Sequence, residues 1–250
     1  MNTEEGKYIY CITEARAGVE HFGPIGIGGR GDEVCTISLH GIAAVVSNSP
    51  LKKYTVAREN LIPHERAIEE VMKTRTVLPV RFATIAESED KVKRILEKEQ
   101  LQFAQMLKSI EGKRELGLKA VFKENIYSDI VANYEQIRIE KEKIAKGPLR
   151  EFALMDIGRQ VEAALEKEKE RYKDAILEDL TPLSLEVKLN RTYGERMILN
   201  AAFLVKEQTE ASFDQKVNEI GDRYRDKVNF KYIAAPPFNF VTIEIDTRAY

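Results

Sequence analysis

The stretch "TVLPVRFATI" (residues 76–85) decides the predicted fold, because it is an apolar, β-branched run between two helical patterns. Before it, "RENLIPHERAIEEVMK" (58–73) keeps apolar residues at a spacing of three and four. After it, "SEDKVKRILEKEQLQFAQMLKSIEG" (88–112) is strongly amphipathic, with Ser88 as its N-cap and Gly112 at its end. Strands connected through helices predict an α+β arrangement of helices on a sheet.

Further strands lie on both sides of these elements. The runs "KYIYCI" (7–12), "EVCTISL" (33–39) and "IAAVVS" (42–47) have the aromatic and β-branched composition of strands. After the second helix, "RELGLKAVF" (114–122) is a further strand, so the first half has the order β-ββ-α-β-α-β. With two helices for about five strands, we expect both helices on one face of the sheet. The sequence therefore predicts a ferredoxin-like α+β domain over residues 1–124.

The second half, residues 125–250, is predicted to form another α+β domain, with long helices and a small antiparallel sheet. Two charge-rich helical patterns come first and are separated at Gly147-Pro148. A hairpin, a helix and two strands follow, the last strand being "FNFVTIEI" (238–245). In the second helical pattern the apolar stripe is formed by Leu154, Ile157, Val161, Leu165, Tyr172 and Ile176.

Composition excludes several classes of protein. The chain has 250 residues and a net charge of -2, so no overall positive field draws it to nucleic acid or to anionic lipid. The start "MNTEEGKYIY" lacks the features of a secretory signal, and no apolar run approaches the roughly 20 residues that span a bilayer. We therefore expect a cytoplasmic chain with no membrane partner. In such a chain Cys11 and Cys35, which could face each other across the sheet, are expected to stay buried thiols.

Motifs for catalysis or cofactors are weak. "GIGGRG" (26–31) fits a dinucleotide-binding pattern, but a strand follows it where a helix is required, so we interpret it as a connection. The three histidines lack metal-ligand spacing, and His64 is expected at a helix start. The sequence predicts no catalytic residue, cofactor site or metal site. One alternative stays open, an enzyme with a small-molecule site around Tyr10, Arg81 and Glu115.

Two proline-containing segments are the candidate docking surfaces. In the first, Pro79 removes one ladder donor from a predicted strand, and in the second Pro236-Pro237 do so before the last strand. An open sheet edge with aromatic neighbours suits a protein partner, although for any single phenylalanine a place in the core is the favoured interpretation. We expect Arg81 to bind an acidic group, either Glu115 or one on the partner. The predicted partner-binding residues are Pro79, Arg81, Phe82, Pro236, Pro237, Phe238 and Phe240.

The same residues carry a resemblance along nearly the whole chain. The stretch "PHERAIEEVMKTRTVLPVRFATI" (63–85) is its most specific part, and the ending "APPFNFVTIEI" (235–245) comes next; "YIYCI", "GIAAVVS", "LKSIEGKRELGLKAVF" and "GPLREFAL" occur in matching order. The chain resembles the gas vesicle protein F/L family. It departs from that pattern at Ala83, where the family usually has Gly, and at Leu116, where an aromatic residue is frequent.

The resemblance implies more than the composition does. It implies a two-domain α+β protein whose first domain has a modified ferredoxin-like fold. It implies a non-enzymatic accessory protein, located with the gas vesicle, that binds the hydrophobic shell subunit and other accessory proteins. A soluble partner with apolar surfaces could hold a shell subunit that would otherwise aggregate. Besides the enzyme, a generic helical adaptor that uses the charged helices from Glu135 to Lys173 stays as an alternative.

Overall fold

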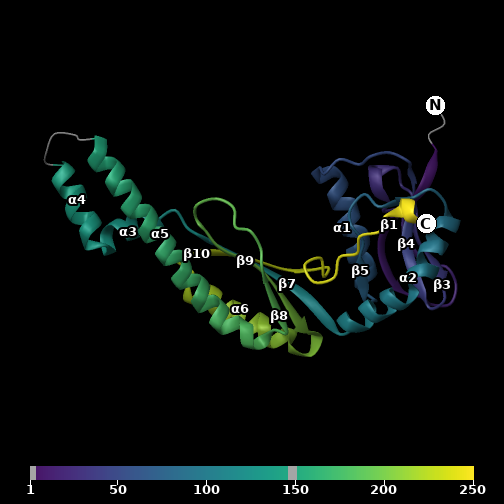
Figure 1. The fold of residues 1–250 in the computed structure, drawn as a ribbon. Coiled ribbons are helices and arrows are strands. Elements are labelled where there is room, and N and C mark those ends of the chain that lie inside the picture. The colour runs from purple at the N-terminus through teal and green to yellow at the C-terminus, as the bar shows by residue number, and fades with distance from the viewer. Residues whose placement is uncertain (1–3, 146–150) are drawn as a thin grey trace. The chain divides into compact units, whose positions relative to one another are not determined.

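The computed structural model describes residues 4–145 and 151–250 (Figure 1). The Cα positions divide the chain into two compact units. Unit 1 contains the chain up to Glu115 together with Ala235–Tyr250, and unit 2 contains Leu116–Ala234. Both units combine helices with antiparallel sheets, which confirms the α+β class. The expected division after residue 124 and the ferredoxin-like assignment of the first domain stay predictions.

Unit 1 is built on a six-stranded sheet. Its strands run in the order β2-β3-β4-β1-β5, and β6 also pairs with β1. The strands are β1 (Glu5–Glu14), β2 (His21–Gly23), β3 (Val34–Leu39), β4 (Ile42–Pro50), β5 (Val77–Pro79) and β6 (Ile85–Ala86). The predicted strand over 76–85 is therefore two short strands, because a turn at residues 82–83 interrupts it.

The two helices of unit 1 cover opposite faces of this sheet. Helix α1 (Arg58–Met72) packs on the cluster that contains Tyr8 and Tyr10, whereas α2 (Glu89–Ile110) packs on the cluster that contains Ile9 and Ile12. Successive side chains of a strand point to opposite faces, so the two clusters lie on either side of β1. The expectation that both helices share one face is wrong.

A β-bulge in β1 shapes the face under α1. Ile9 pairs with Val46 and Cys11 pairs with Val45, which leaves Tyr10 as the extra residue. A bulge lets two successive residues point to the same side. Tyr10 and Cys11 accordingly both belong to the cluster under α1.

Local predictions for unit 1 hold elsewhere. Ser88 caps α2 by accepting a hydrogen bond from the Lys91 amide, and Gly112 has a positive φ of 65° just after the helix. The glycine-rich stretch forms the short 3-10 helix η1 (Ile27–Gly29) and continues to strand β3, as a connection would. Cys11 and Cys35 are free thiols that do not face each other, because β4 lies between their strands; Cys11 is buried and Cys35 is half-buried.

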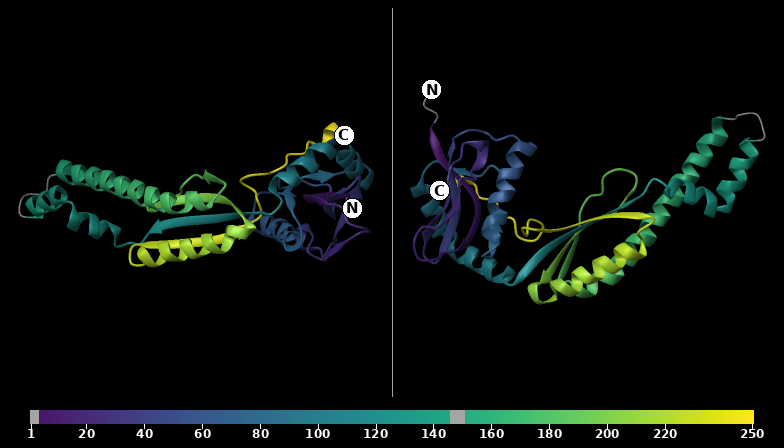
Figure 2. Two further views of the ribbon diagram at one scale, coloured as in Figure 1. Left: turned by 90° about the horizontal axis from the view of Figure 1, so that it is seen from below. Right: turned by 180° about the vertical axis from the view of Figure 1, so that it is seen from behind.

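Unit 2 is a four-stranded sheet with helices on one face, as Figure 2 shows for α5 and α6. The strand order is β10-β7-β9-β8. The strands are β7 (Lys113–Phe122), β8 (Glu186–Leu189), β9 (Met197–Lys206) and β10 (Val228–Ala235). The helices are α3 (Ile126–Asn133), α4 (Glu135–Ala145), α5 (Glu151–Leu180) and α6 (Glu210–Arg223), and short 3-10 turns lie at η2 (Thr181–Leu183) and η3 (Glu207–Thr209).

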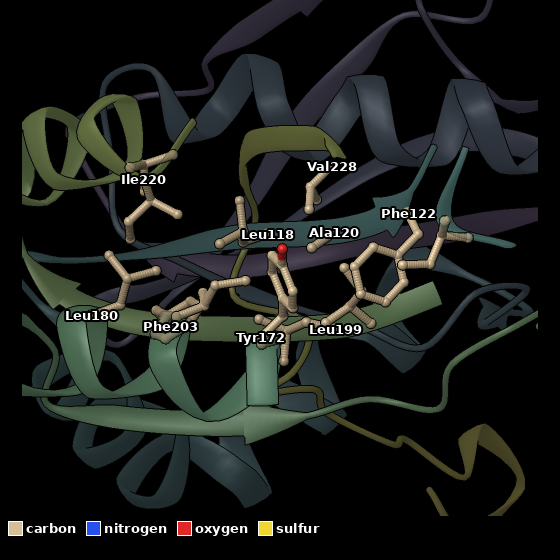
Figure 3. Packing of buried hydrophobic residues seen from close by; sticks show 14 of the residues in the cluster. Leu118, Ala120, Phe122, Tyr172, Leu180, Leu199, Phe203, Ile220 and Val228 are labelled. Atoms are coloured by element: carbon tan, nitrogen blue, oxygen red, sulfur yellow. The ribbon is translucent and has the colours of Figure 1, made fainter. Parts of the chain in front are cut away.

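The core of unit 2 follows the alternation of its strands. Leu118, Ala120 and Phe122 point from β7 to the helices, and Leu199 and Phe203 do so from β9 (Figure 3). Helices α5 and α6 contribute the other side of this cluster through Tyr172, Leu180 and Ile220. The sheet therefore buries one face against helices.

Two expectations for unit 2 need correction. The first helical pattern is two helices, because the chain leaves the helical conformation at Tyr134, where ψ is 100°. In the predicted stripe of α5, Leu165, Tyr172 and Ile176 are buried, but Leu154 is 46% exposed. The predicted separation at Gly147-Pro148 lies outside the described residues. No helix in the described ranges is both long and apolar enough to cross a membrane.

Candidate docking surface

The two predicted docking segments lie side by side in unit 1. The Ile243 amide donates to the Pro79 carbonyl and the Arg81 amide donates to the Ile243 carbonyl, both at 2.8 Å. The Arg81 guanidinium also forms an ion pair with Glu244 at 3.1 Å. These contacts amount to a short parallel bridge between Val80 and Ile243. Residues about 160 positions apart in the sequence are thus combined into one surface.

The expected strand over 238–245 is wrong. The chain turns instead: the Phe240 and Val241 amides donate to the Pro237 carbonyl at 3.1 and 2.9 Å. Asn239 holds this turn in place, because its amide and its side-chain nitrogen donate to the Glu115 carboxylate at 2.9 and 2.5 Å. A further short 3-10 turn, η4 (Thr247–Ala249), ends the chain. Glu115 is 3% exposed, so its carboxylate anchors the turn from inside unit 1.

A buried hydrogen-bond network supports the other segment. The Tyr8 hydroxyl accepts from the Ala83 amide at 2.9 Å and lies 3.1 Å from Nδ1 of His64. The other ring nitrogen of His64 donates to the Val80 carbonyl. Nδ1 is then the acceptor of the Tyr8 proton. The network joins β1, α1 and the turn at residues 81–84, and it holds Ala83 at a positive φ of 65°.

Burial keeps the members of this network uncharged. It lowers the pKa of His64 to about 4, although the hydrogen bond to Val80 opposes this shift. Burial also raises the pKa of the Tyr8 hydroxyl above its ordinary value, and raises that of Tyr10 to about 12. Tyr10 in turn accepts from the Ile27 amide at 2.7 Å and bonds the Ser47 hydroxyl at 2.8 Å. A neutral, fully paired network of this kind rigidifies the segment above it.

Of the predicted docking residues, the three prolines are buried and the side chains above them are partly accessible. Phe82 and Phe238 are half-buried and pack on the same cluster as Tyr8. The Phe82 ring stands perpendicular to the His64 ring, with centroids 5.6 Å apart. Phe240 is half-buried as well, and the Arg81 side chain is 67% exposed. The accessible part of the surface is therefore aromatic with one cation.

A shallow groove of about 480 Å³ runs beside the turn at residues 81–84. Three of its lining residues, Lys52, Lys53 and Arg81, are cationic. The rest of the lining is Leu51, Phe82, Ala83, Thr84, Ile85, Ile245, Asp246 and Thr247.

The side chains of the alternative enzyme site each bind other partners. Arg81 lines the groove, but Glu115 and Tyr10 do not. Glu115 accepts a hydrogen bond from Asn239, whereas Arg81 forms its ion pair with Glu244. The acidic partner of Arg81 within the chain is therefore Glu244 and not Glu115. Within residues 4–145 and 151–250, no group of three or more His, Cys, Asp or Glu could hold a metal ion.

Sequence reasoning missed the residues that support and flank this surface. His64 lies in the middle of α1 and not at its start. Its spacing with the buried Ala67, Ile68 and Val71 is the helical core pattern, which could have placed it inside. Lys52 and Lys53 carry no comparable signal, since two exposed lysines before a helix are ordinary surface residues.

A family model, curated proteins and solved structures all relate this chain to gas vesicle proteins. The family model described as gas vesicle synthesis protein GvpL/GvpF matches residues 6–242. Gas vesicle protein F of a Nostoc species is 26% identical over 210 residues, which are 82% of this chain and 86% of that protein. Gas vesicle protein F of Dolichospermum flosaquae is 24% identical over 203 residues, which are 79% of this chain and 83% of that protein.

Solved structures agree along the chain. The crystal structure of gas vesicle protein GvpF from an Anabaena species has a TM-score of 0.80 at 25% identity, covering 96% of this chain and 99% of that one. The GvpF structure from Microcystis aeruginosa has a TM-score of 0.72 at 24% identity, covering 94% and 98%, and shows the same fold. The chain belongs to the GvpL/GvpF family of gas vesicle synthesis proteins.

Proposed function

We propose that the protein is a non-enzymatic accessory factor of gas vesicle formation that binds the hydrophobic shell subunit and other accessory proteins at the vesicle. Membership of the GvpL/GvpF family carries this proposal. The two docking segments support it, because the bridge between Val80 and Ile243 combines them into one surface of unit 1.

The chemistry of this surface suits a partly apolar partner. Phe82, Phe238 and Phe240 are half-buried, so each offers part of a ring without leaving a large exposed patch that would promote aggregation. Arg81 adds a charge at the rim, where it can orient a partner. The buried Pro79, Pro236 and Pro237 act by placing the backbone beneath these side chains.

Retention of the purified shell subunit on the immobilised full-length chain tests this proposal. We expect Arg81→Glu together with Phe82→Ala to reduce retention several-fold, while circular dichroism melting shows that the fold persists. The matched control is Arg225→Glu in unit 2, an equally exposed arginine that pairs with Asp222. No retention by the unaltered chain, together with normal vesicles in a deletion strain, would overturn the proposal.

A helical adaptor is the second candidate, and one observation favours it. Phe152 and Met155 of α5 are 85% and 56% exposed, which is unusual for side chains of this size. If the helices form the contact surface, charge reversal along residues 135–173 abolishes retention of the partner protein. The Arg81→Glu, Phe82→Ala variant then still retains that partner. The same retention assay therefore separates the two candidates.

A further inference from the structure

We infer that the groove beside the turn at residues 81–84 binds an acidic peptide segment of a partner protein in which acidic and apolar side chains alternate. The inference rests on the proposed function in one respect: Arg81 and Phe82 belong to both surfaces. It adds the chemical class of the partner segment and two residues, Lys52 and Lys53, to the docking surface.

The shape of the groove fits an extended segment. Three separate segments of unit 1, residues 51–53, 81–85 and 245–247, line it. Its volume of about 480 Å³ is within the range of roughly 300–1,000 Å³ that ligand sites occupy. It is open to solvent, so a segment of a larger partner protein can reach it.

The charge of the groove is opposite to that of the whole chain. Lys52, Lys53 and Arg81 face it, and its acidic lining residue, Asp246, accepts two hydrogen bonds from Arg248 at 3.1 Å. Those bonds lower the pKa of Asp246, so its charge is already matched. The net charge of the chain is -2, so this local surplus of cations favours an acidic ligand.

Two of these cations are available. The Lys52 ammonium lies 4.9 Å from the centre of the Tyr54 ring, a contact that leaves its hydrogen-bond donors open to a carboxylate. Across the described parts of the chain, no carboxylate comes within ion-pair distance of Lys52 or Lys53. A partner carboxylate would therefore meet them without breaking an existing pair, whereas at Arg81 it would compete with Glu244.

The turn at residues 81–84, which lines the groove, is preorganised. The Thr84 hydroxyl donates to the Arg81 carbonyl at 2.7 Å, and the Ile9 amide donates to the Thr84 carbonyl at 2.9 Å. With the Ala83 amide held by Tyr8, the turn has little freedom left to lose when a peptide binds.

Apolar groups lie among the cations and select the alternating pattern. Leu51 is 37% exposed and Phe82 and Ile85 are half-buried, so each offers apolar surface inside the groove. In an extended peptide, successive side chains point to opposite sides. A segment that alternates acidic and apolar residues can thus bring carboxylates to the cations and apolar side chains to the apolar lining residues of the groove. A nucleic acid would need a longer basic track than three cations on an acidic chain provide.

Fluorescence anisotropy with a labelled peptide of alternating Glu and Leu tests the inference on the full-length chain. We expect saturable binding that weakens about tenfold in Lys52→Ser, Lys53→Ser, because each exposed charge contact contributes modestly. Binding should also weaken in about 0.5 M salt. The control Lys98→Ser, Lys108→Ser removes two exposed lysines of α2 and should leave binding unchanged. Peptides of alternating Lys and Leu, or Glu and Ser, should bind less well.

Equal binding by the two double variants, or equal binding of the Lys and Leu peptide, would overturn the inference. If the unaltered chain retains the shell subunit but shows no saturable binding of the Glu and Leu peptide, the inference is removed while the proposed function stands. If the unaltered chain binds the peptide but does not retain the shell subunit, the proposed function is removed and the peptide-binding groove stands. Circular dichroism of each variant shows whether the fold is intact.

Discussion

At the scale of single residues, the docking surface depends on a histidine that is buried in its neutral form. His64 is 3% exposed, its ring lies against Tyr10 and Phe82, and both of its nitrogens have hydrogen-bond partners. Protonation would place a second donor opposite the Tyr8 hydroxyl, whose lone pair already accepts from Ala83. The charged form is therefore disfavoured in the folded chain.

This burial predicts a specific loss of stability in acid. The pKa of His64 falls from 6.5 to about 4 on folding, so the unfolded chain binds a proton that the folded chain does not. The contribution of the neutral histidine to the free energy of unfolding is complete above pH 6.5 and is lost as the pH falls toward about 4. The shift corresponds to a loss on the order of 3 kcal/mol. Urea unfolding of wild type and His64→Gln at pH 7 and pH 4.5 measures it.

The comparison between variants isolates this histidine from the carboxylates that also titrate in acid. His64→Gln should be less stable at pH 7 but lose less stability on acidification than the wild type. His21→Gln is the control for removal of an imidazole outside this network, because the His21 side chain is 62% exposed and lies beside Glu33 at the surface. If His64→Gln and wild type lose the same free energy of unfolding, the buried-histidine account is wrong.

At the scale of elements, the turn at residues 236–242 depends on one side chain. Asn239 donates two hydrogen bonds to the buried Glu115 carboxylate. Asn239→Ala removes the side-chain bond and loosens the backbone one, and hydrogen bonds to a charged group contribute about 1.5–3 kcal/mol each. We expect a destabilisation of about 2 kcal/mol in thermal unfolding, with faster hydrogen exchange at Val241 and Ile243.

Asn229→Ala provides the matched comparison, because Asn229 is an exposed asparagine on β10. Exposed substitutions usually change stability by less than about 0.5 kcal/mol. Equal effects of the two substitutions would show that the Asn239–Glu115 contact does not hold the turn.

The same turn shows why some elements could be predicted and others could not. Helix α2 was predicted correctly because its cap at Ser88, its apolar stripe and its end at Gly112 are all local signals. The alternation in "FNFVTIEI" also indicates a strand, but Asn239 binds a carboxylate 124 positions away. No local pattern reports such a partner, and the preceding prolines offer no amide to a ladder.

The candidate surface was predictable only in parts. Aromatic residues beside prolines drew attention to Phe82 and Phe238 separately, and the structure joins them through a long-range contact between Val80 and Ile243. The opposite placement of α1 and α2 could not be read from element order, because alternation along β1 supplies apolar residues to both faces.

At the scale of the whole molecule, the chain leaves unit 1 and returns to it. Ala235–Tyr250 belongs to the same compact unit as the residues up to Glu115. Within unit 1, Ile243 is 6% exposed in the cluster under α2, and the Tyr250 hydroxyl donates to Glu99 at 2.6 Å. The C-terminal segment is therefore part of the first core, although it follows unit 2 in sequence.

This arrangement predicts that a fragment ending at residue 124 is less stable than one that keeps the C-terminal segment. Burial of one isoleucine contributes about 1.5–3 kcal/mol, and the backbone bonds of Ile243 add to it. A short Gly-Ser linker can join residues 4–115 to residues 235–250, because β7 and β10 lie side by side just beyond these two ends. A Cβ on Gly117 of β7 would lie 3.4 Å from the side chain of Ile233 on β10. We expect the free energy of unfolding, measured in urea, to be several kcal/mol larger for the joined chain than for residues 4–124 alone.

Substitutions in the joined chain test whether the gain comes from the core contact. Ile243→Ser should remove most of the added stability, because it deletes the buried side chain while leaving the peptide backbone in place. Ala249→Ser, at an exposed position near the C-terminus, should remove almost none. If residues 4–124 alone match the joined chain in urea, the first domain folds within the boundary expected from the sequence, and the C-terminal segment only lies on its surface.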